Sequence, residues 1–198
     1  MIIVDVETTG LDPLRCAILS IGAVDFSDPS RTFYRECRIF SDALVSSEAL
    51  AINGFTWDHV QRTDLDDLSV VLADFLSWMS TVTDQTLAGE NPSFDRDFLR
   101  AAFDRCGIRA SLGYRTLDLH TLCYAHHLLR RLVPPLKYNR TNISADTCLV
   151  YVGLPAEPKP HHALVGAKME AEAFSRLLLG KGLLAEFAPY PVPQYLLQ

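Results

Sequence analysis

The sequence predicts an α/β protein built on a mixed β-sheet. Three apolar or alternating segments with short connections come first, which is typical of an antiparallel meander. Segments with helical periodicity then alternate with short strands. A chain of 198 residues suits one domain with a complete hydrophobic core. We therefore expect a single domain over 1–198, with an irregular, proline-rich tail over 182–198.

The first half of the chain supplies the meander and two helical regions. Its first strand is short and apolar, its second is mostly apolar, and its third alternates as a half-exposed strand does. The turn signal SDPSR separates the second strand from the third. The expected elements are strands within 2–6, 17–26 and 32–40, two short helical turns within 48–60, and a helix within 65–79.

The second half alternates strand and helix. Pro92 starts one helix and Gly107 stops it, and Gly153 and Pro155 close another. The sequence PAEPKP then reads as a rigid, extended loop. The expected elements are a strand within 86–91, a helix over 92–107, a fifth strand that continues as a helix within 115–132, and helices within 143–155 and over 163–179.

Composition limits the classes of partner. The formal net charge of -6 argues against a broad basic surface for long duplex nucleic acid. A local basic stretch, with Arg130, Arg131, Lys137 and Arg140, either contacts a short strand or is an ordinary solvated loop. The five scattered cysteines form no CxxC pair, so we expect neither zinc nor disulfides. Short apolar runs and a start that reads as a strand predict no membrane partner and a cytoplasmic location.

Two carboxylates lie close together in the first strand. Asp5 and Glu7 are two residues apart, so their side chains leave the same face of a strand. Paired acids on a buried strand repel each other and lose hydration, which a bound cation offsets. Mg²⁺ or Mn²⁺ suits such oxygen ligands better than zinc. Alternatively, the strand ends at Val4 and both acids lie in solvent.

Asp95 is the next candidate carboxylate. It lies in ENPSFDRDFL, at the start of the helix over 92–107. Taken alone, it is better explained as an acid that stabilises the positive end of the helix dipole, with Asp97 as an equal competitor.

Three motifs in order resemble those of the DEDD exonucleases. They are DVETTG, NPSFDRDFL and HHALVGAKMEAEAF, and the resemblance covers nearly the whole chain. It is to the histidine-bearing branch, which includes proofreading subunits of bacterial DNA polymerases, ribonuclease T and oligoribonucleases. The resemblance implies a ribonuclease H-like fold with a five-stranded mixed sheet flanked by helices.

The resemblance also implies a chemistry. Asp5 would bridge two divalent cations about 4 Å apart, with Glu7 on the first and Asp95 on the second. Thr8 and Thr9 would receive the terminal nucleotide through their backbone, and Leu11 would support its base. Asn91 and Phe94 are further expected substrate contacts. A histidine would take a proton from the attacking water, a role that suits a pKa near about 6.5.

The third motif selects between two histidines. The family pattern places alanine two and six residues after the histidine, which His161 satisfies with Ala163 and Ala167. His162 would need alanine where Leu164 stands. We therefore expect His161 to be the general base and His162 to be a bystander.

The family's fourth acid is absent, because Gly166 occupies its position. Either the site is impaired or another residue replaces the ligand. Glu170 lies one helical turn later, about 40° around the same flank, and its side chain leans back toward the N-terminus. We favour Glu170 as the replacement ligand over a solvated acid. Glu172 is expected on the opposite, solvent-exposed side.

The sequence therefore predicts a metal-dependent 3'-5' exonuclease that releases nucleoside monophosphates from single-stranded ends, with two Mg²⁺ or Mn²⁺ ions. An impaired module that only binds nucleic-acid ends is the alternative that Gly166 suggests, and a phosphohydrolase of small nucleotides is a weaker one. No motif separates DNA from RNA, which depends on contacts to the 2'-hydroxyl. The resemblance allows a homodimer, and the sequence identifies no protein partner.

Overall fold

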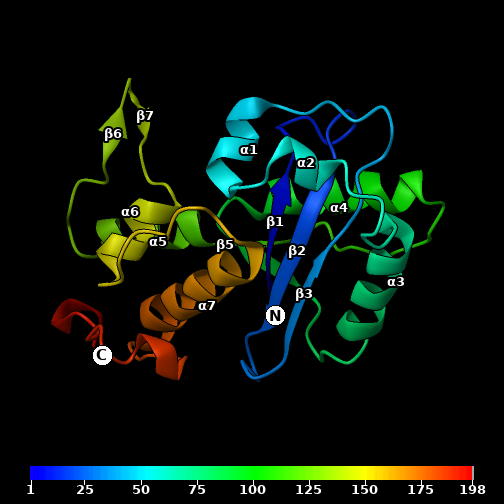
Figure 1. The fold of residues 1–198 in the computed structure, drawn as a ribbon. Helices are drawn as coiled ribbons and strands as arrows, with labels where there is room; N and C mark the ends of the chain where they lie inside the picture. Colours follow the sequence, from blue (N-terminus) through cyan, green and yellow to red (C-terminus); the bar gives the residue numbers. More distant parts are fainter. Residues whose placement is uncertain (198) are drawn as a thin grey trace.

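The computed structural model describes residues 1–197 and contains a five-stranded mixed sheet with helices on both faces (Figure 1). The strand order is β3-β2-β1-β4-β5. The β1–β2 and β2–β3 pairs are antiparallel, whereas β1–β4 and β4–β5 are parallel. This confirms the predicted α/β class and mixed sheet. The strands are β1 (Ile2–Thr8), β2 (Ile18–Asp25), β3 (Thr32–Glu36), β4 (Leu87–Gly89) and β5 (Leu117–Asp118).

The helices follow the predicted order closely. The last long helix runs over the predicted residues, and the break at Asn53 and Gly54 separates two short helices. The helix predicted from residue 65 begins only at Leu68, because Asp67 has extended backbone angles and serves as its N-cap. The helices are α1 (Ser47–Asn53), α2 (Trp57–Val60), α3 (Leu68–Met79), α4 (Pro92–Arg105), α5 (Leu119–Leu129), α6 (Ala145–Tyr151) and α7 (Ala163–Leu179).

The central strand β1 divides the hydrophobic core between the two faces of the sheet. Ile2, Val4 and Val6 belong to the core formed with α3 and α4. Ile3 belongs to the core formed with α5, α6 and α7. Because side chains alternate along a strand, Asp5 and Glu7 leave on the same face as Ile3. The two carboxylates therefore point toward the side of the sheet that α7 covers.

Helix α7 begins in direct contact with β2. Gly22 is the register partner of Asp5 in the β1–β2 pair. A Cβ atom at Gly22 would lie 2.2 Å from the backbone carbonyl carbon of Ala163, the first residue of α7. Glycine is thus required there for the backbone of the helix to approach the backbone of the sheet. This approach places the first turn of α7 beside Asp5.

Glu172 is buried, so its expected exposure is wrong. Its carboxylate accepts a bond from Arg176 at 2.8 Å and from the backbone N–H groups of Leu183 and Leu184 at 2.7 and 2.8 Å. Both charged side chains of the ion pair are 1% exposed. The physical reason is that the chain after α7 folds back over this flank and supplies donors, which helical periodicity cannot reveal.

The segments after α5 and α7 are more ordered than expected. A short hairpin of β6 (Leu136–Lys137) and β7 (Arg140–Thr141) stands out beside α6 in Figure 1. In the tail, two 3₁₀ turns occur at Ala185–Phe187 and Gln194–Leu196. Arg130 stacks over the ring of Tyr195 and donates to its carbonyl at 2.8 Å. The tail is therefore anchored on the body of the protein and is only partly irregular.

Across residues 1–197, no helix is both long and apolar enough to cross a lipid bilayer.

We predict that Gly22→Ala destabilises the protein by about 1–3 kcal/mol, because its Cβ would overlap backbone atoms that cannot rotate away. Gly113→Ala is the matched control, since a Cβ there meets only the carbonyl of Arg115 at 3.8 Å. Denaturant unfolding of both variants provides the measurement. Equal stability of the two variants would contradict the assigned contact between α7 and β2.

Candidate active site

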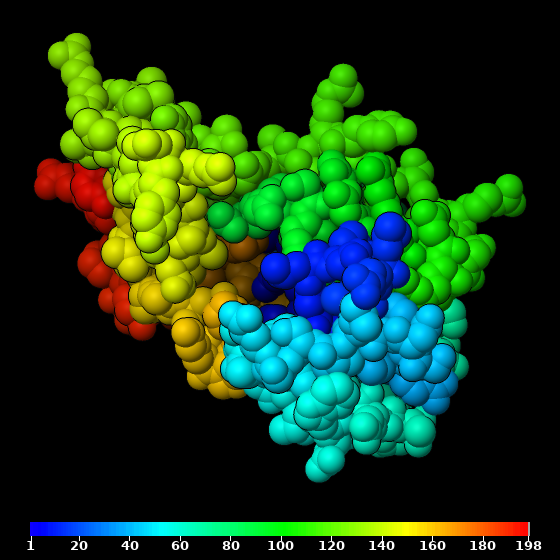
Figure 2. Space-filling view, turned by 90° about the horizontal axis from the view of Figure 1, so that it is seen from above, coloured from blue at the N-terminus to red at the C-terminus, as the bar shows by residue number. Residues whose placement is uncertain are grey.

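A cleft of about 470 Å³ opens where β1 ends, bordered by α1, the start of α4, and the segment that precedes α7. Figure 2 shows the hollow between the blue N-terminal strand region, the cyan α1 region and the yellow segment near residue 150. Seven carboxylates line the cleft: Asp5, Glu7, Glu48, Glu90, Asp95, Glu157 and Glu170.

The structure brings the three predicted motif acids together. Asp5 and Glu7 lie within β1, which extends to Thr8, so the alternative that the strand ends at Val4 is wrong. Asp95 is 5% exposed, and its Oδ1 accepts a hydrogen bond from the backbone N–H of Val6 at 3.0 Å. This bond ties the start of α4 to the centre of β1.

Asp97 does not share this position. Its side chain is 48% exposed and pairs with the neighbouring Arg96 at 3.0 Å. Of the two acids that the sequence left in competition, Asp95 is the one that lines the cleft.

Glu170 also reaches the cleft, from the second turn of α7. It is 8% exposed, and its Oε2 atom is buried without a hydrogen-bond donor. This oxygen lies 3.1 Å from the point where a Cβ on Gly89 would stand. Gly89 of β4 therefore leaves room for the Glu170 carboxylate.

The space beside Gly166 is filled by other carboxylates. A Cβ at Gly166 would lie 2.1 Å from Oδ2 of Asp5 and 3.2 Å from Oε1 of Glu157. The absence of a side chain at this position thus allows two acidic groups to approach the helix backbone.

The two adjacent histidines have different surroundings. His161 lines the cleft, and its Nδ1 lies 3.6 Å from Oε2 of Glu157. One ligand atom from each of Glu7, Glu157 and His161 lies within 4.8 Å of the others. His162 stacks on Tyr34 with ring centroids 4.3 Å apart and borders a neighbouring pocket. His161 therefore lines the acidic cleft, whereas His162 does not.

Two contacts hold the segment before α7 against the end of α1, and a third holds α1 against β1. The backbone N–H of His161 donates to the carbonyl of Ile52 at 3.0 Å. Pro160 packs so closely on Gly54 that a Cβ there would meet its ring at 2.4 Å. Asn53 is buried, and its amide donates to the carbonyl of Thr8 at 3.1 Å. The histidine, the α1–α2 turn and the end of β1 are therefore linked.

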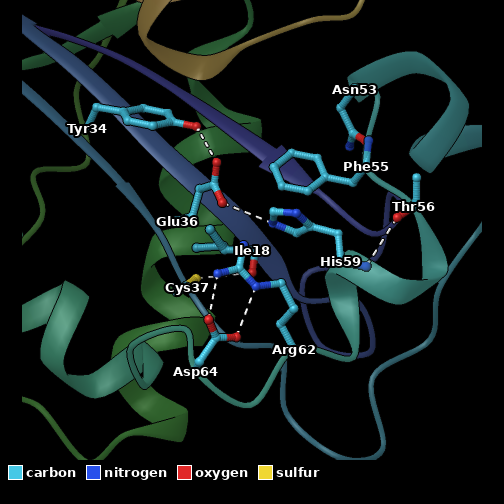
Figure 3. A network of polar contacts seen from close by, with 10 residues as sticks. All are labelled: Ile18, Tyr34, Glu36, Cys37, Asn53, Phe55, Thr56, His59, Arg62 and Asp64. Carbon is cyan, nitrogen blue, oxygen red and sulfur yellow. Dashed lines mark hydrogen bonds and ion pairs between the residues drawn. The ribbon is translucent and has the colours of Figure 1, made fainter.

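A network of polar contacts connects Tyr34 and Glu36 to the segment that follows the α1–α2 turn (Figure 3). The Tyr34 hydroxyl donates to Glu36 Oε1 at 3.0 Å, and Glu36 Oε2 lies 2.9 Å from Nε2 of His59. The His59 ring meets Phe55 edge-on, and Thr56 caps α2 by accepting from the His59 N–H. The strand β3 thereby fixes the turn that carries Asn53.

Four of the five expected substrate contacts line the cleft: Thr8, Leu11, Asn91 and Phe94. Thr9 does not, and the expectation for it is wrong. Thr9 is fully buried, its hydroxyl bonds the carbonyl of Leu44 and the N–H of Ala17, and its own N–H donates to Ala17. Its polar groups are used to hold the loop after β1.

Burial and mutual repulsion raise the pKa values of the cleft acids. Burial is the main cause for each, and it raises the pKa of both Glu7 and Asp95 to about 7. The pKa of Asp5 lies well above its usual value through burial and then the charges of Asp95 and Glu170. The pKa of Glu170 is likewise raised well above normal, by burial and then by Asp95.

The donor set fits divalent cations. Within residues 1–197 the cleft is lined by seven carboxylates and no lysine or arginine. Two of its buried carboxylate oxygens, on Glu157 and Glu170, have no hydrogen-bond donor. Hard cations such as Mg²⁺ and Mn²⁺ prefer oxygen ligands of this kind and offset their repulsion. Asp5, Glu7, Asp95 and Glu170 all contribute carboxylates to this donor set.

Sequence reasoning missed Glu157. The sequence carried one signal for it, an acid held between prolines in PAEPKP, four residues before the selected histidine. Periodicity could not place this residue, because the loop has neither a helical nor a strand repeat.

Comparison with known proteins gives the family. Residues 1–178 match the model of the 3'-5' exoribonuclease Rv2179c-like domain. The chain belongs to this family. Family membership places it among 3'-5' exonuclease domains, as the sequence predicted.

Two curated relatives illustrate the range of similar proteins. The chain is 25% identical over 175 residues to the 3'-5' DNA exonuclease Cap18 of Escherichia coli, and the match covers 86% of this chain and 87% of Cap18. It is 29% identical over 130 residues to a PolC-type DNA polymerase III of Listeria innocua, covering 65% of this chain. The match spans only 9% of that polymerase.

Solved structures share the fold. Exonuclease I superposes with a TM-score of 0.74 and 19% identity, over 91% of this chain and 40% of that protein. The cell-death related nuclease CRN-4 superposes with a TM-score of 0.69 and 16% identity, over 91% of this chain and 64% of CRN-4. These neighbours confirm the ribonuclease H-like exonuclease fold.

The raised pKa of Glu7 predicts a pH-dependent stability in metal-free buffer. The folded state keeps this proton up to about pH 7, whereas an unfolded glutamate loses it near 4.5, so stability falls as pH rises through that window. Relative to wild type, Glu7→Gln should therefore gain stability with pH, by at most about 1.4 kcal/mol per pH unit. Thermal unfolding in chelator across this window measures the difference.

The exposed cleft residue Glu48 supplies the control for this experiment, as Glu48→Gln. A stability difference between Glu7→Gln and wild type that does not change with pH would contradict the assigned burial of Glu7.

Proposed function

We propose that this chain is a divalent-cation-dependent 3'-5' exonuclease that removes nucleoside monophosphates from single-stranded nucleic-acid ends. The observation that carries the proposal is the cleft itself: seven carboxylates and a histidine, without lysine or arginine among the lining residues of 1–197. A nucleic-acid phosphate would be repelled by these groups alone, and bound cations reverse the sign of the local charge.

The roles of the carboxylates follow from their positions. We assign Asp5, Glu7, Asp95 and Glu170 as ligands of two Mg²⁺ or Mn²⁺ ions, which supply a nucleophilic water and charge stabilisation at the phosphate when bound. The Val6 N–H fixes Asp95, and the packing of α7 on Gly22 fixes Glu170 and Asp5 relative to each other. We propose on this basis that the chain belongs to the histidine-bearing branch of the DEDD exonucleases.

His161 is assigned as the general base. Its Nδ1 faces Glu157 at 3.6 Å, so we assign proton uptake from water to Nε2. The Glu157 carboxylate would stabilise the imidazolium that results. The backbone bond from His161 to Ile52 holds the histidine at the cleft during this transfer.

The substrate end would lie along the rim formed by Thr8, Leu11, Asn91 and Phe94. Leu11 is 85% exposed at the mouth of the cleft, and an exposed apolar side chain there can pack against a base. Cap18 is named as a DNA exonuclease, whereas the family model is named for an exoribonuclease. We therefore propose that the substrate is a single-stranded 3' end, and that DNA and RNA are compared directly as substrates.

We predict that the protein shortens 5'-labelled single-stranded oligonucleotides stepwise with Mn²⁺ and that chelator stops the reaction. Asp95→Asn should lower the rate by about 10³-fold or more, because charge stabilisation in such sites supplies factors of this size. Asp97→Asn, two residues away and paired outside the cleft, should stay within about twofold of wild type. Gel analysis of DNA and RNA substrates measures both. If neither polymer is shortened by wild type, the proposed activity is wrong.

We predict that His161→Gln lowers kcat by about 10²–10⁴-fold, the usual contribution of a general base. The variant should also change the acidic limb of the pH–rate profile, because only the cleft carboxylates can then contribute to that limb. A variant that retains the wild-type profile would show that another group accepts the proton.

A second candidate function is a module that binds nucleic-acid ends without cleaving them. Gly166 favours this candidate, because it stands where the family has its fourth acid. This candidate predicts Mn²⁺-dependent binding of an oligonucleotide by wild type with no shortening, and cleavage only in Gly166→Asp. Measurable cleavage by wild type excludes this candidate.

A further inference from the structure

We propose that Glu157 takes the place of the acid absent from position 166 and is a ligand of the divalent cation bound by Asp5 and Glu7. The inference rests on the proposed function for the presence of that cation. It adds a ligand from the loop before α7, where the sequence predicted only Glu170 from the helix.

The position of the Glu157 carboxylate is the first argument. Its Oε1 lies 3.2 Å from the point where a Cβ on Gly166 would stand, beside Oδ2 of Asp5 at 2.1 Å from the same point. An acidic side chain at residue 166 would begin in this space. Ligand atoms of Glu7, Glu157 and His161 also lie within 4.8 Å of one another. The Glu157 carboxylate thus lies close to both Asp5 and Glu7.

Burial is the second argument. The Glu157 side chain is 9% exposed, and Oε1 is buried without a hydrogen-bond donor. A carboxylate removed from water is costly unless a charge or donor compensates it. Its Oε2 has His161 nearby at 3.6 Å, but Oε1 points into the cleft toward other acids. A cation among these oxygens supplies the missing partner.

The backbone around Glu157 is fixed in advance. Its N–H donates to Oδ1 of Asp146 in the first turn of α6 at 3.0 Å. Pro158 follows directly and restricts the backbone of Glu157 to extended conformations. Further along, Pro160 packs on Gly54 at the end of α1. Anchors on two helices therefore hold the carboxylate over Gly166.

Glu170 and Glu157 approach the site from different directions. Glu170 directs its buried Oε2 toward Gly89 of β4. The Glu157 carboxylate instead lies over Gly166, and one of its oxygens is within 4.8 Å of a ligand atom of Glu7. The two acids therefore reach the site from α7, beside β4, and from the loop before α7, respectively.

Orientation of His161 is the competing role for Glu157. A residue that only orients the histidine changes the pH–rate profile and leaves cation affinity unaltered. The affinity for Mn²⁺ alone, measured without nucleic acid, therefore separates a ligand from a positioning residue.

The test is titration of the full chain with Mn²⁺, following free Mn²⁺ by electron paramagnetic resonance. Glu157→Gln, which keeps size and removes charge, should weaken the tightest Mn²⁺ site by at least about tenfold. Glu48→Gln removes an exposed acid from the same cleft and should stay within about twofold, because exposed charges are screened by solvent. Thermal unfolding in chelator confirms that each variant is folded.

Wild-type Mn²⁺ affinity in Glu157→Gln would overturn the inference, and so would an equal loss in Glu48→Gln, which would indicate only general charge attraction. If Glu157→Gln does not fold, Glu157→Asp withdraws the carboxylate by one methylene and should weaken Mn²⁺ in the same way. A wild type that binds Mn²⁺ through Glu157 but leaves oligonucleotides intact would overturn the proposed function and leave this inference standing.

Discussion

The site depends on the direct packing of the first turn of α7 against the backbone of β2. Gly22 permits this contact, and Gly166, one turn into the helix, brings the helix backbone against the carboxylate of Asp5. The same register directs Glu170 toward the sheet. A residue larger than glycine at position 22 would separate the helix from the strand, whereas one at position 166 would require the Asp5 carboxylate to move aside. The geometry of the acidic cleft is therefore set by backbone packing as much as by the acids themselves.

The protein treats its buried acids in two ways. Glu172 is neutralised within the fold, by Arg176 and two backbone donors. No lysine or arginine of residues 1–197 lines the cleft beside Asp5, Glu7 and Glu170, and burial is the main cause that raises the pKa values of these three acids. Burial of acids without a basic partner costs stability, which the rest of the fold offsets. The contrast separates an acid that is paired within the fold from acids that lack a basic partner in the cleft.

The elements and the motif acids could be predicted because periodicity and motif order carry that information. The helix α7 has the expected residues, the strand β1 extends beyond the expected 2–6 to Thr8, and Asp5, Glu7 and Asp95 share one cleft. The predictions for Thr9 and Glu172 were wrong. The Thr9 hydroxyl bonds a backbone group distant in sequence, and the Glu172 carboxylate bonds backbone groups that the chain brings back after α7. Such partners have no local signature, and for the same reason the sequence did not indicate where the proline loop would lie.

The loop before α7 has a consequence for how sites of this kind vary. Position 166 lies in the first turn of α7, where a side chain would meet the carboxylates of Asp5 and Glu157. Position 157 lies in a short connection whose backbone is held by Asp146 and by prolines. A charge on such a connection can be gained or lost without repacking the core. Under the proposed role of Glu157, the charge missing from the helix at position 166 would come from the connection before it, and the site would keep its number of acids.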